Sequence, residues 1–180
     1  MKLNLPNKLT LMRVILVPFF VWAFLMKWYV VALILFAVAS ITDFLDGYIA
    51  RKNNLVTNFG KFLDPLADKV LVISALACFT DVGLINCVPL IIIASREFMV
   101  SGLRLIASGE GVVIPAGMSG KLKTAFTMVS IIYILMYCIL GLSNGVPYVI
   151  LQVLVWISVA LTIYSGCEYL KGCWKYIKEE

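Results

Sequence analysis

The sequence contains no histidine. This absence excludes a Ser-His-Asp or Cys-His triad, a phosphohistidine intermediate and a zinc site with histidine ligands. Acid–base chemistry must therefore depend on carboxylates, lysine or tyrosine. The five cysteines form no C-x-x-C pair, and most of them lie in apolar segments, where cysteine behaves as a small hydrophobic residue.

Charged residues are also scarce. Only 14% of the 180 residues are charged, 62% are hydrophobic, and the mean hydropathy is +1.00. This fraction of hydrophobic residues is too high for a soluble domain of the same length, so we expect an integral membrane protein. No polar or low-complexity stretch is long enough to form a soluble domain. Residues 1–180 are therefore expected to form a single transmembrane domain.

The apolar segments predict an all-α bundle of six transmembrane helices. The two clearest segments, residues 124–142 and 146–167, carry no charge and are separated by a turn at residues 143–145. Each is close to the length of about 20 residues that crosses a bilayer. The other four spans, each with charged residues toward one end, are expected at residues 11–26, 28–49, 62–80 and 82–106.

The basic residues predict the orientation of these spans. If both termini are cytoplasmic, only Lys27 lies on the outer side, and all the other basic residues of the links and termini lie on the inner side. These are Lys2, Lys8, Arg13, Arg51, Lys52, Lys61, Arg104, Lys121, Lys123, Lys171, Lys175 and Lys178. The net charge of +5 then indicates topology and contact with anionic lipids, and we expect no nucleic-acid partner.

Four aspartates, Asp43, Asp46, Asp64 and Asp68, lie in or beside segments apolar enough to enter the bilayer. A carboxylate at membrane depth costs about 2.5 kcal/mol or more, so the group needs a compensating partner. A divalent cation, which binds clustered carboxylate oxygens, is the simplest partner. The alternative is that these are ordinary charged side chains that extend to the membrane interface or form ion pairs there. That explanation is adequate for a single aspartate but not for four aspartates at these spacings.

The spacing of the aspartates predicts how they meet. Asp43 and Asp46 are three residues apart, and Asp64 and Asp68 are four apart, so each pair shares one face of a helix. The short link between the helices predicts antiparallel neighbours whose carboxylate pairs face one crevice. Such a crevice has ligands for two divalent ions, and ligation by oxygen alone favours Mg²⁺ or Mn²⁺ over zinc.

Two divalent ions are suited to phosphoryl transfer, because they neutralise the charge of a pyrophosphate and stabilise both the attacking oxygen and the leaving-group oxygen. The residues around the aspartates fit a nucleotide. Gly47 and Gly60 would let the backbone approach it closely, Ala50 would keep the wall thin, and Arg51 would bind a phosphate with two nitrogens.

The segment from Asp43 to Asp68 resembles the motif D-x2-D-G-x2-A-R-x8-G-x3-D-x3-D of the CDP-alcohol phosphotransferase family at every fixed position. The resemblance implies a fold of six transmembrane helices, a homodimer and a CDP-linked donor. It also implies that Asp43, Asp46 and Asp64 hold the metal ions. Asp68, also near the metal, would be the base for an acceptor hydroxyl that attacks the lipid-side phosphorus and expels CMP.

Residues 6–13 resemble the amino-terminal segment of the same family, which implies that Asn7 and Thr10 lie near the nucleotide. On the residues alone, the same segment is the start of a helix at the membrane interface. In that interpretation Asn7 is a helix cap.

A phosphorylated acceptor needs an anion site beside the metal ions. Arg96 and Arg104 are eight residues apart, roughly on one helix face near the inner end of their span, and Lys121 and Lys123 begin the next span. Together they could bind a phosphate monoester, with Glu97 pairing with or orienting an arginine. The alternative is that these are charges that only set the topology.

Residues 96–104 and 120–124 resemble the bacterial phosphatidylglycerophosphate synthases of this family. This resemblance implies transfer from CDP-diacylglycerol to sn-glycerol 3-phosphate at the cytoplasmic face of a bacterial cell membrane. Within the same chemistry, the alternatives are a cardiolipin synthase of the CDP-alcohol type, a phosphatidylserine synthase and a phosphatidylinositol-phosphate synthase. In a different class, a small ion or metabolite transporter also carries intramembrane carboxylates, but no inverted repeat is visible and the charges gather at one face.

Overall fold

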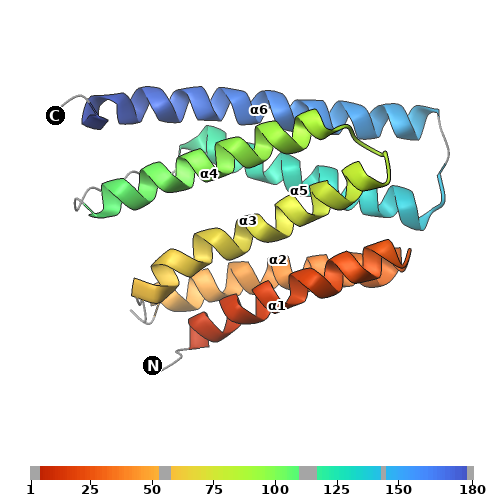
Figure 1. Ribbon diagram of the computed structural model, residues 1–180, viewed down its shortest axis with the longest axis horizontal. Helices are drawn as coiled ribbons and strands as arrows, with labels where there is room; N and C mark the ends of the chain where they lie inside the picture. Colours follow the sequence, from red (N-terminus) through yellow and green to blue (C-terminus); the bar gives the residue numbers. More distant parts are fainter. Residues whose placement is uncertain (1–4, 53–57, 110–116, 143–144, 178–180) are drawn as a thin grey trace.

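Figure 1 shows the computed structural model of the protein, a bundle of helices that run alternately in opposite directions. The structure describes residues 5–52, 58–109, 117–142 and 145–177; at 5–9, 43–52, 58–66, 68, 105–106, 108–109 and 173–177 it describes the backbone only. The helices are α1 (Leu5–Leu25), α2 (Tyr29–Lys52), α3 (Asn58–Asp81), α4 (Cys87–Gly109), α5 (Met118–Ile139) and α6 (Val146–Ile177). All regular structure in these ranges is helical, so the predicted all-α class and its six helices are confirmed there.

The predicted start of the fourth helix, at residue 82, is wrong by five residues. Gly83 has φ of +73°, a left-handed conformation that ends the preceding helix without a steric penalty. The side-chain Oδ1 of Asn86 then accepts a hydrogen bond of 3.0 Å from the backbone N–H of Val88, so Asn86 caps α4. Helix α4 therefore begins at Cys87.

The N-terminal end of α1 and the C-terminal end of α6 lie at the same end of the bundle, at the left of Figure 1. We call this end the terminal end. It holds the C-terminal ends of α2, α4 and α6 and the N-terminal ends of α1, α3 and α5. The turns between α1 and α2, between α3 and α4, and between α5 and α6 lie at the opposite end. The predicted site residues within the described helices lie in the halves toward the terminal end, except Arg96, which lies just before the middle of α4.

Aromatic side chains join α1, α2 and α3 into one core. Phe20, Phe24, Phe36 and Phe79 are all at most 1% exposed. The ring centroid of Phe24 lies 5.4 Å from those of both Tyr29 and Phe79, in edge-to-face geometry. Helix α1 packs along both α2 and α3, whereas the described parts of α2 and α3 contact each other only sparsely. The predicted antiparallel directions of α2 and α3 are confirmed, whereas each of these helices packs mainly on α1.

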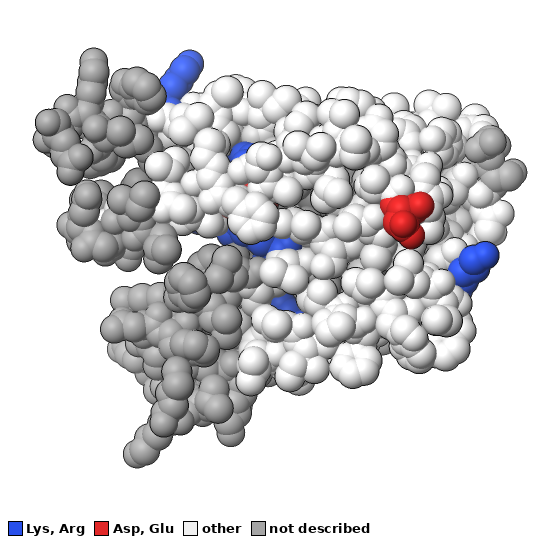
Figure 2. All heavy atoms as spheres, viewed as in Figure 1, with Lys and Arg blue, Asp and Glu red and all other residues white. Residues whose placement is uncertain are grey.

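The outer surface is strongly apolar. Large hydrophobic side chains are exposed on all six helices, and in Figure 2 charged atoms are sparse on the face shown. Surfaces of this kind are covered by lipid or by another protein. By length and composition, two of the described helical segments, Met118–Ile139 and Val146–Gly172, can each cross a membrane, and Thr10–Leu25 and Tyr29–Thr42 are shorter apolar segments.

We predict that Phe24→Ala lowers the free energy of unfolding by about 3 kcal/mol, because it leaves a cavity between α1, α2 and α3. The control is Phe19→Ala on the same helix, since the Phe19 side chain is 54% exposed and its removal leaves no cavity. Reversible denaturation of both variants in the same detergent measures the difference. Equal losses of stability would contradict this description of the core.

Candidate active site

The four aspartates of the motif lie on two helices that meet at the terminal end. Asp43 and Asp46 are on α2, and Asp64 and Asp68 are on α3. The predicted helical placement of both pairs is confirmed, but their side chains lie outside what the structure describes. The facing of the two pairs across one crevice therefore stays a prediction. The same holds for the side chains of Ala50 and Arg51 on α2; Gly47 is also on α2, and Gly60 lies in the first turn of α3.

The chemical type of the candidate ligands indicates which metal ions the motif could bind. Among the side chains that the structure describes, no group of three or more His, Cys, Asp and Glu residues gathers. The four motif aspartates are outside that set. They supply only carboxylate oxygens, which are the ligands that Mg²⁺ and Mn²⁺ prefer.

Two polar residues of α1 are buried near its start. Thr10 is 0% exposed and Arg13 is 1% exposed, and their three-residue spacing puts them on one helix face. Thr10 was expected near the nucleotide, whereas the sequence indicated only a topological role for Arg13. The feature of the sequence that could have indicated the burial of Arg13 beside Thr10 is the three-residue spacing between them. Asn7 lies in the first turn of α1, which begins at Leu5, so the helix starts too early for Asn7 to be its cap.

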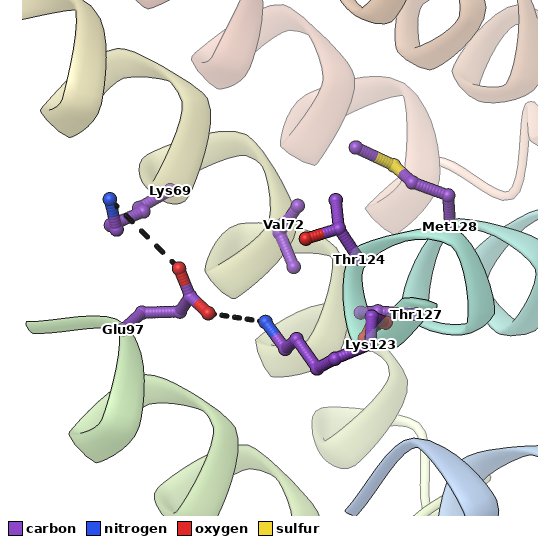
Figure 3. Close-up of a pocket in the computed structure, with 7 residues that line it drawn as sticks. All are labelled: Lys69, Val72, Glu97, Lys123, Thr124, Thr127 and Met128. Atoms are coloured by element: carbon purple, nitrogen blue, oxygen red, sulfur yellow. Dashed lines mark hydrogen bonds and ion pairs between the residues drawn. The ribbon is translucent and has the colours of Figure 1, made fainter. Parts of the chain in front are cut away.

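One carboxylate connects α3, α4 and α5. In Figure 3, the Glu97 side chain points between Lys69 of α3 and Lys123 of α5. The Lys123 ammonium donates a hydrogen bond to Glu97 Oε1. The same Oε1 accepts a bond of 3.1 Å from Arg96 Nη1, and Lys69 Nζ lies 3.9 Å from Oε2. We call these four residues the Glu97 cluster. Their side chains are only 4–14% exposed, so the interaction is weakly screened by solvent.

The cavity beside the cluster is small. It has a volume of about 20 Å³, and Lys69, Glu97, Lys123 and Thr124 contribute to its lining. A space of this size accommodates about one water molecule.

Glycines on two helices make room for Arg96. A Cβ atom at Gly166 of α6 would lie 3.3 Å from Arg96 Cγ, and one at Gly120 of α5 would lie 3.7 Å from Nη2. The Arg96 Nε atom is buried and has no hydrogen-bond acceptor among the described residues. Arg96 thus sits where α4, α5 and α6 meet, with one donor unused.

The four basic residues proposed from the sequence fall into two groups. Arg96 and Lys123 meet on Glu97, and the expected pairing of Glu97 with an arginine is confirmed. Arg104 lies instead over the Tyr169 ring of α6, 5.5 Å from its centroid, and Lys121 is exposed. Lys69 is the residue that the sequence reasoning missed. The only feature of the sequence that could have pointed to Lys69 is its position directly after Asp68.

Comparison with known proteins decides the family. The family model described as CDP-alcohol phosphatidyltransferase matches residues 3–164, which include the whole aspartate motif. The chain belongs to the CDP-alcohol phosphatidyltransferase family. The resemblance predicted from residues 43–68 is therefore confirmed.

Within the CDP-alcohol phosphatidyltransferase family, the chain is similar over nearly its whole length to several bacterial proteins. One from Bacillus subtilis is 42% identical over 97% of both chains. One from Rickettsia felis is 40% identical, over 96% of this chain and 97% of the relative. One from Haemophilus influenzae is 39% identical over 95% and 94%. All three carry the name CDP-diacylglycerol–glycerol-3-phosphate 3-phosphatidyltransferase.

We predict that Lys123→Met lowers the free energy of unfolding by about 2 kcal/mol, because it removes a buried partner of the Glu97 carboxylate. The matched control is Lys121→Met, two residues earlier on α5, where the side chain is exposed and the stability is expected to stay unchanged. Denaturation of both variants in one detergent compares them. Indistinguishable stabilities would show that the buried ion pair does not hold α4 and α5 together.

Proposed function

We propose that this protein is a membrane phosphatidyltransferase that moves the phosphatidyl group of CDP-diacylglycerol to sn-glycerol 3-phosphate, giving phosphatidylglycerophosphate and CMP. The observation that carries the proposal is the identity of 40–42%, over at least 96% of the chain, to bacterial proteins of that name. The aspartate motif on α2 and α3 supplies residues suited to this chemistry.

Asp43, Asp46 and Asp64, together with Asp68, would hold one or two Mg²⁺ or Mn²⁺ ions. The ligand set, four carboxylates in a chain without histidine, fits these ions. When bound, the ions would neutralise the pyrophosphate of the donor and polarise its phosphorus. The spacing of three and four residues within helices supports a pair of ligands from each of α2 and α3.

Asp68 would act as the general base. It would accept the proton of the free primary hydroxyl of glycerol 3-phosphate as the hydroxyl oxygen forms a bond to the lipid-side phosphorus. The bond between that phosphorus and the bridging oxygen of the pyrophosphate breaks, and CMP leaves with the electron pair. No covalent enzyme intermediate is needed, and a carboxylate is suited to the base role in a protein without histidine.

The cytidine diphosphate would bind where α1 meets α2 and α3. The residues proposed for it are Asn7, Thr10, Gly47, Ala50, Arg51 and Gly60. The packing of α1 along both motif helices and the burial of Thr10 support this location. Arg51 would bind a phosphate, and the glycines would permit close backbone approach.

The phosphate of the acceptor would bind to Arg96 and Lys123, with Arg104 and Lys121 at the same end of the bundle available to attract it. Chain connectivity supports this site, because Lys69 of the Glu97 cluster directly follows Asp68 and consecutive Cα atoms are about 3.8 Å apart. An anion bound at the cluster would therefore lie against the helix that carries the proposed base.

All six helices would span the bacterial cell membrane, with both termini and the active site at the cytoplasmic face. The exposed apolar side chains, the alternating directions of the helices and the basic residues at the terminal end support this arrangement. The lipid donor would then enter sideways from the bilayer while the acceptor arrives from the cytosol. The family also implies that the protein is a homodimer.

The experiment is an acceptor panel. Purified protein in vesicles receives radiolabelled CDP-diacylglycerol, Mg²⁺ or Mn²⁺, and one of sn-glycerol 3-phosphate, serine, inositol phosphate or phosphatidylglycerol. We expect equal amounts of CMP and phosphatidylglycerophosphate with glycerol 3-phosphate only, and no turnover after chelation of the metal. Asp68→Asn should lower the rate by at least about 100-fold, as loss of a general base does.

Asp81→Asn is the control for Asp68→Asn, because Asp81 is exposed at the opposite end of the same helix and should not affect the rate. Strong turnover with serine and none with glycerol 3-phosphate would refute the proposed acceptor. A fully active Asp68→Asn variant would refute the assigned base. Absence of CMP release with every acceptor would leave the transporter class as the better interpretation.

A further inference from the structure

We propose that Glu97 is a resident anion: its carboxylate occupies the position that the phosphate of the acceptor takes during turnover, and the acceptor must displace it to bind. Glu97 would then determine which acceptors can enter. This inference rests on the proposed function, because it deepens the acceptor site of that reaction.

The geometry around Glu97 is that of an anion site. Cationic groups from three helices converge on one carboxylate: Lys69 from α3, Arg96 from α4 and Lys123 from α5. In Figure 3, the two lysine ammonium groups approach the carboxylate from different sides. A guanidinium together with ammonium groups is the combination that binds phosphate through charge-assisted hydrogen bonds.

In the observed conformation, the cavity that adjoins the carboxylate among the described residues is too small for a phosphate. The adjoining cavity of about 20 Å³ accommodates one water molecule, whereas a phosphate group brings four oxygens around its phosphorus. Through this cavity, a phosphate can take the place beside Lys123 only if the Glu97 side chain rotates away.

Charge decides which ligand can cause that rotation. A phosphate dianion that replaces the carboxylate keeps Arg96 and Lys123 paired with an anion. If a neutral or zwitterionic alcohol displaced Glu97, it would leave the buried Lys123 and the partly buried Arg96 without an anion among the described residues, which is strongly unfavourable. The unused Nε donor of Arg96 would also gain an acceptor from a phosphate oxygen. Glu97 thus favours phosphorylated acceptors over plain alcohols.

The test is a calorimetric titration of the purified full-length protein with sn-glycerol 3-phosphate and, separately, with inorganic phosphate, without CDP-diacylglycerol. Glu97→Gln keeps the size of the side chain and removes its charge. We expect both anions to bind the variant about tenfold more tightly, because a like charge no longer competes for the cations. Unchanged or weaker binding would overturn the proposal and make Glu97 a residue that positions Arg96 and Lys123.

A second variant guards against loss of folding in Glu97→Gln. Glu97→Asp keeps the negative charge of the cluster but withdraws the carboxylate by one methylene, so it competes less well. It should bind both anions more tightly than the wild type, by a smaller factor than Glu97→Gln. Weaker binding by Glu97→Asp would equally overturn the proposal. Glu168→Gln, which alters an exposed carboxylate on α6, is the matched control and should leave both affinities unchanged.

The same preparations separate this inference from the proposed function. If the wild type turns over serine instead of glycerol 3-phosphate, the proposed acceptor is wrong, while the phosphate titration still decides whether Glu97 is displaced by an anion. If glycerol 3-phosphate is turned over but binds Glu97→Gln less tightly than the wild type, the function stands and the displacement of Glu97 is refuted.

Discussion

The pairing of the Glu97 carboxylate with Lys69, Arg96 and Lys123 is the interaction on which the rest of the account depends. In an apolar bundle, a buried charge is strongly destabilising unless an opposite charge lies beside it. This one carboxylate therefore fixes α3, α4 and α5 relative to one another. Because Lys69 directly follows Asp68, the same contact also sets the position of the motif segment of α3 relative to the acceptor side.

Helix α3 belongs to both halves of the bundle. On one side it packs on α1, which also packs along α2 and buries Thr10 and Arg13 near its start. On the other side it reaches the Glu97 cluster on α4 and α5. The proposed donor site and acceptor site therefore share one helix, and Asp68 lies on that helix. A transferase that joins a lipid-bound and a soluble substrate needs such a shared element to bring the two reacting groups together.

The six helices and the aspartate string were predictable, because long apolar runs and a spaced motif are properties of local sequence. Contacts between helices were not. Lys121 and Lys123 differ by two positions, and on a helix such residues point to different sides; only the packing of α5 shows that Lys123 is the buried one. The bond from Lys123 to Glu97 likewise joins residues 26 positions apart, and no spacing rule reaches that far.

Whether the proposed anion site adjoins the proposed metal site is measured most directly by ³¹P relaxation of bound sn-glycerol 3-phosphate with Mn²⁺ in place of Mg²⁺. The acceptor has a single phosphorus, so its signal reports one position. We expect strong paramagnetic broadening in the wild-type protein, which Asp64→Asn or Arg96→Met removes. If the relaxation of the bound phosphorus is the same with Mn²⁺ as with Mg²⁺, the two sites are not adjacent.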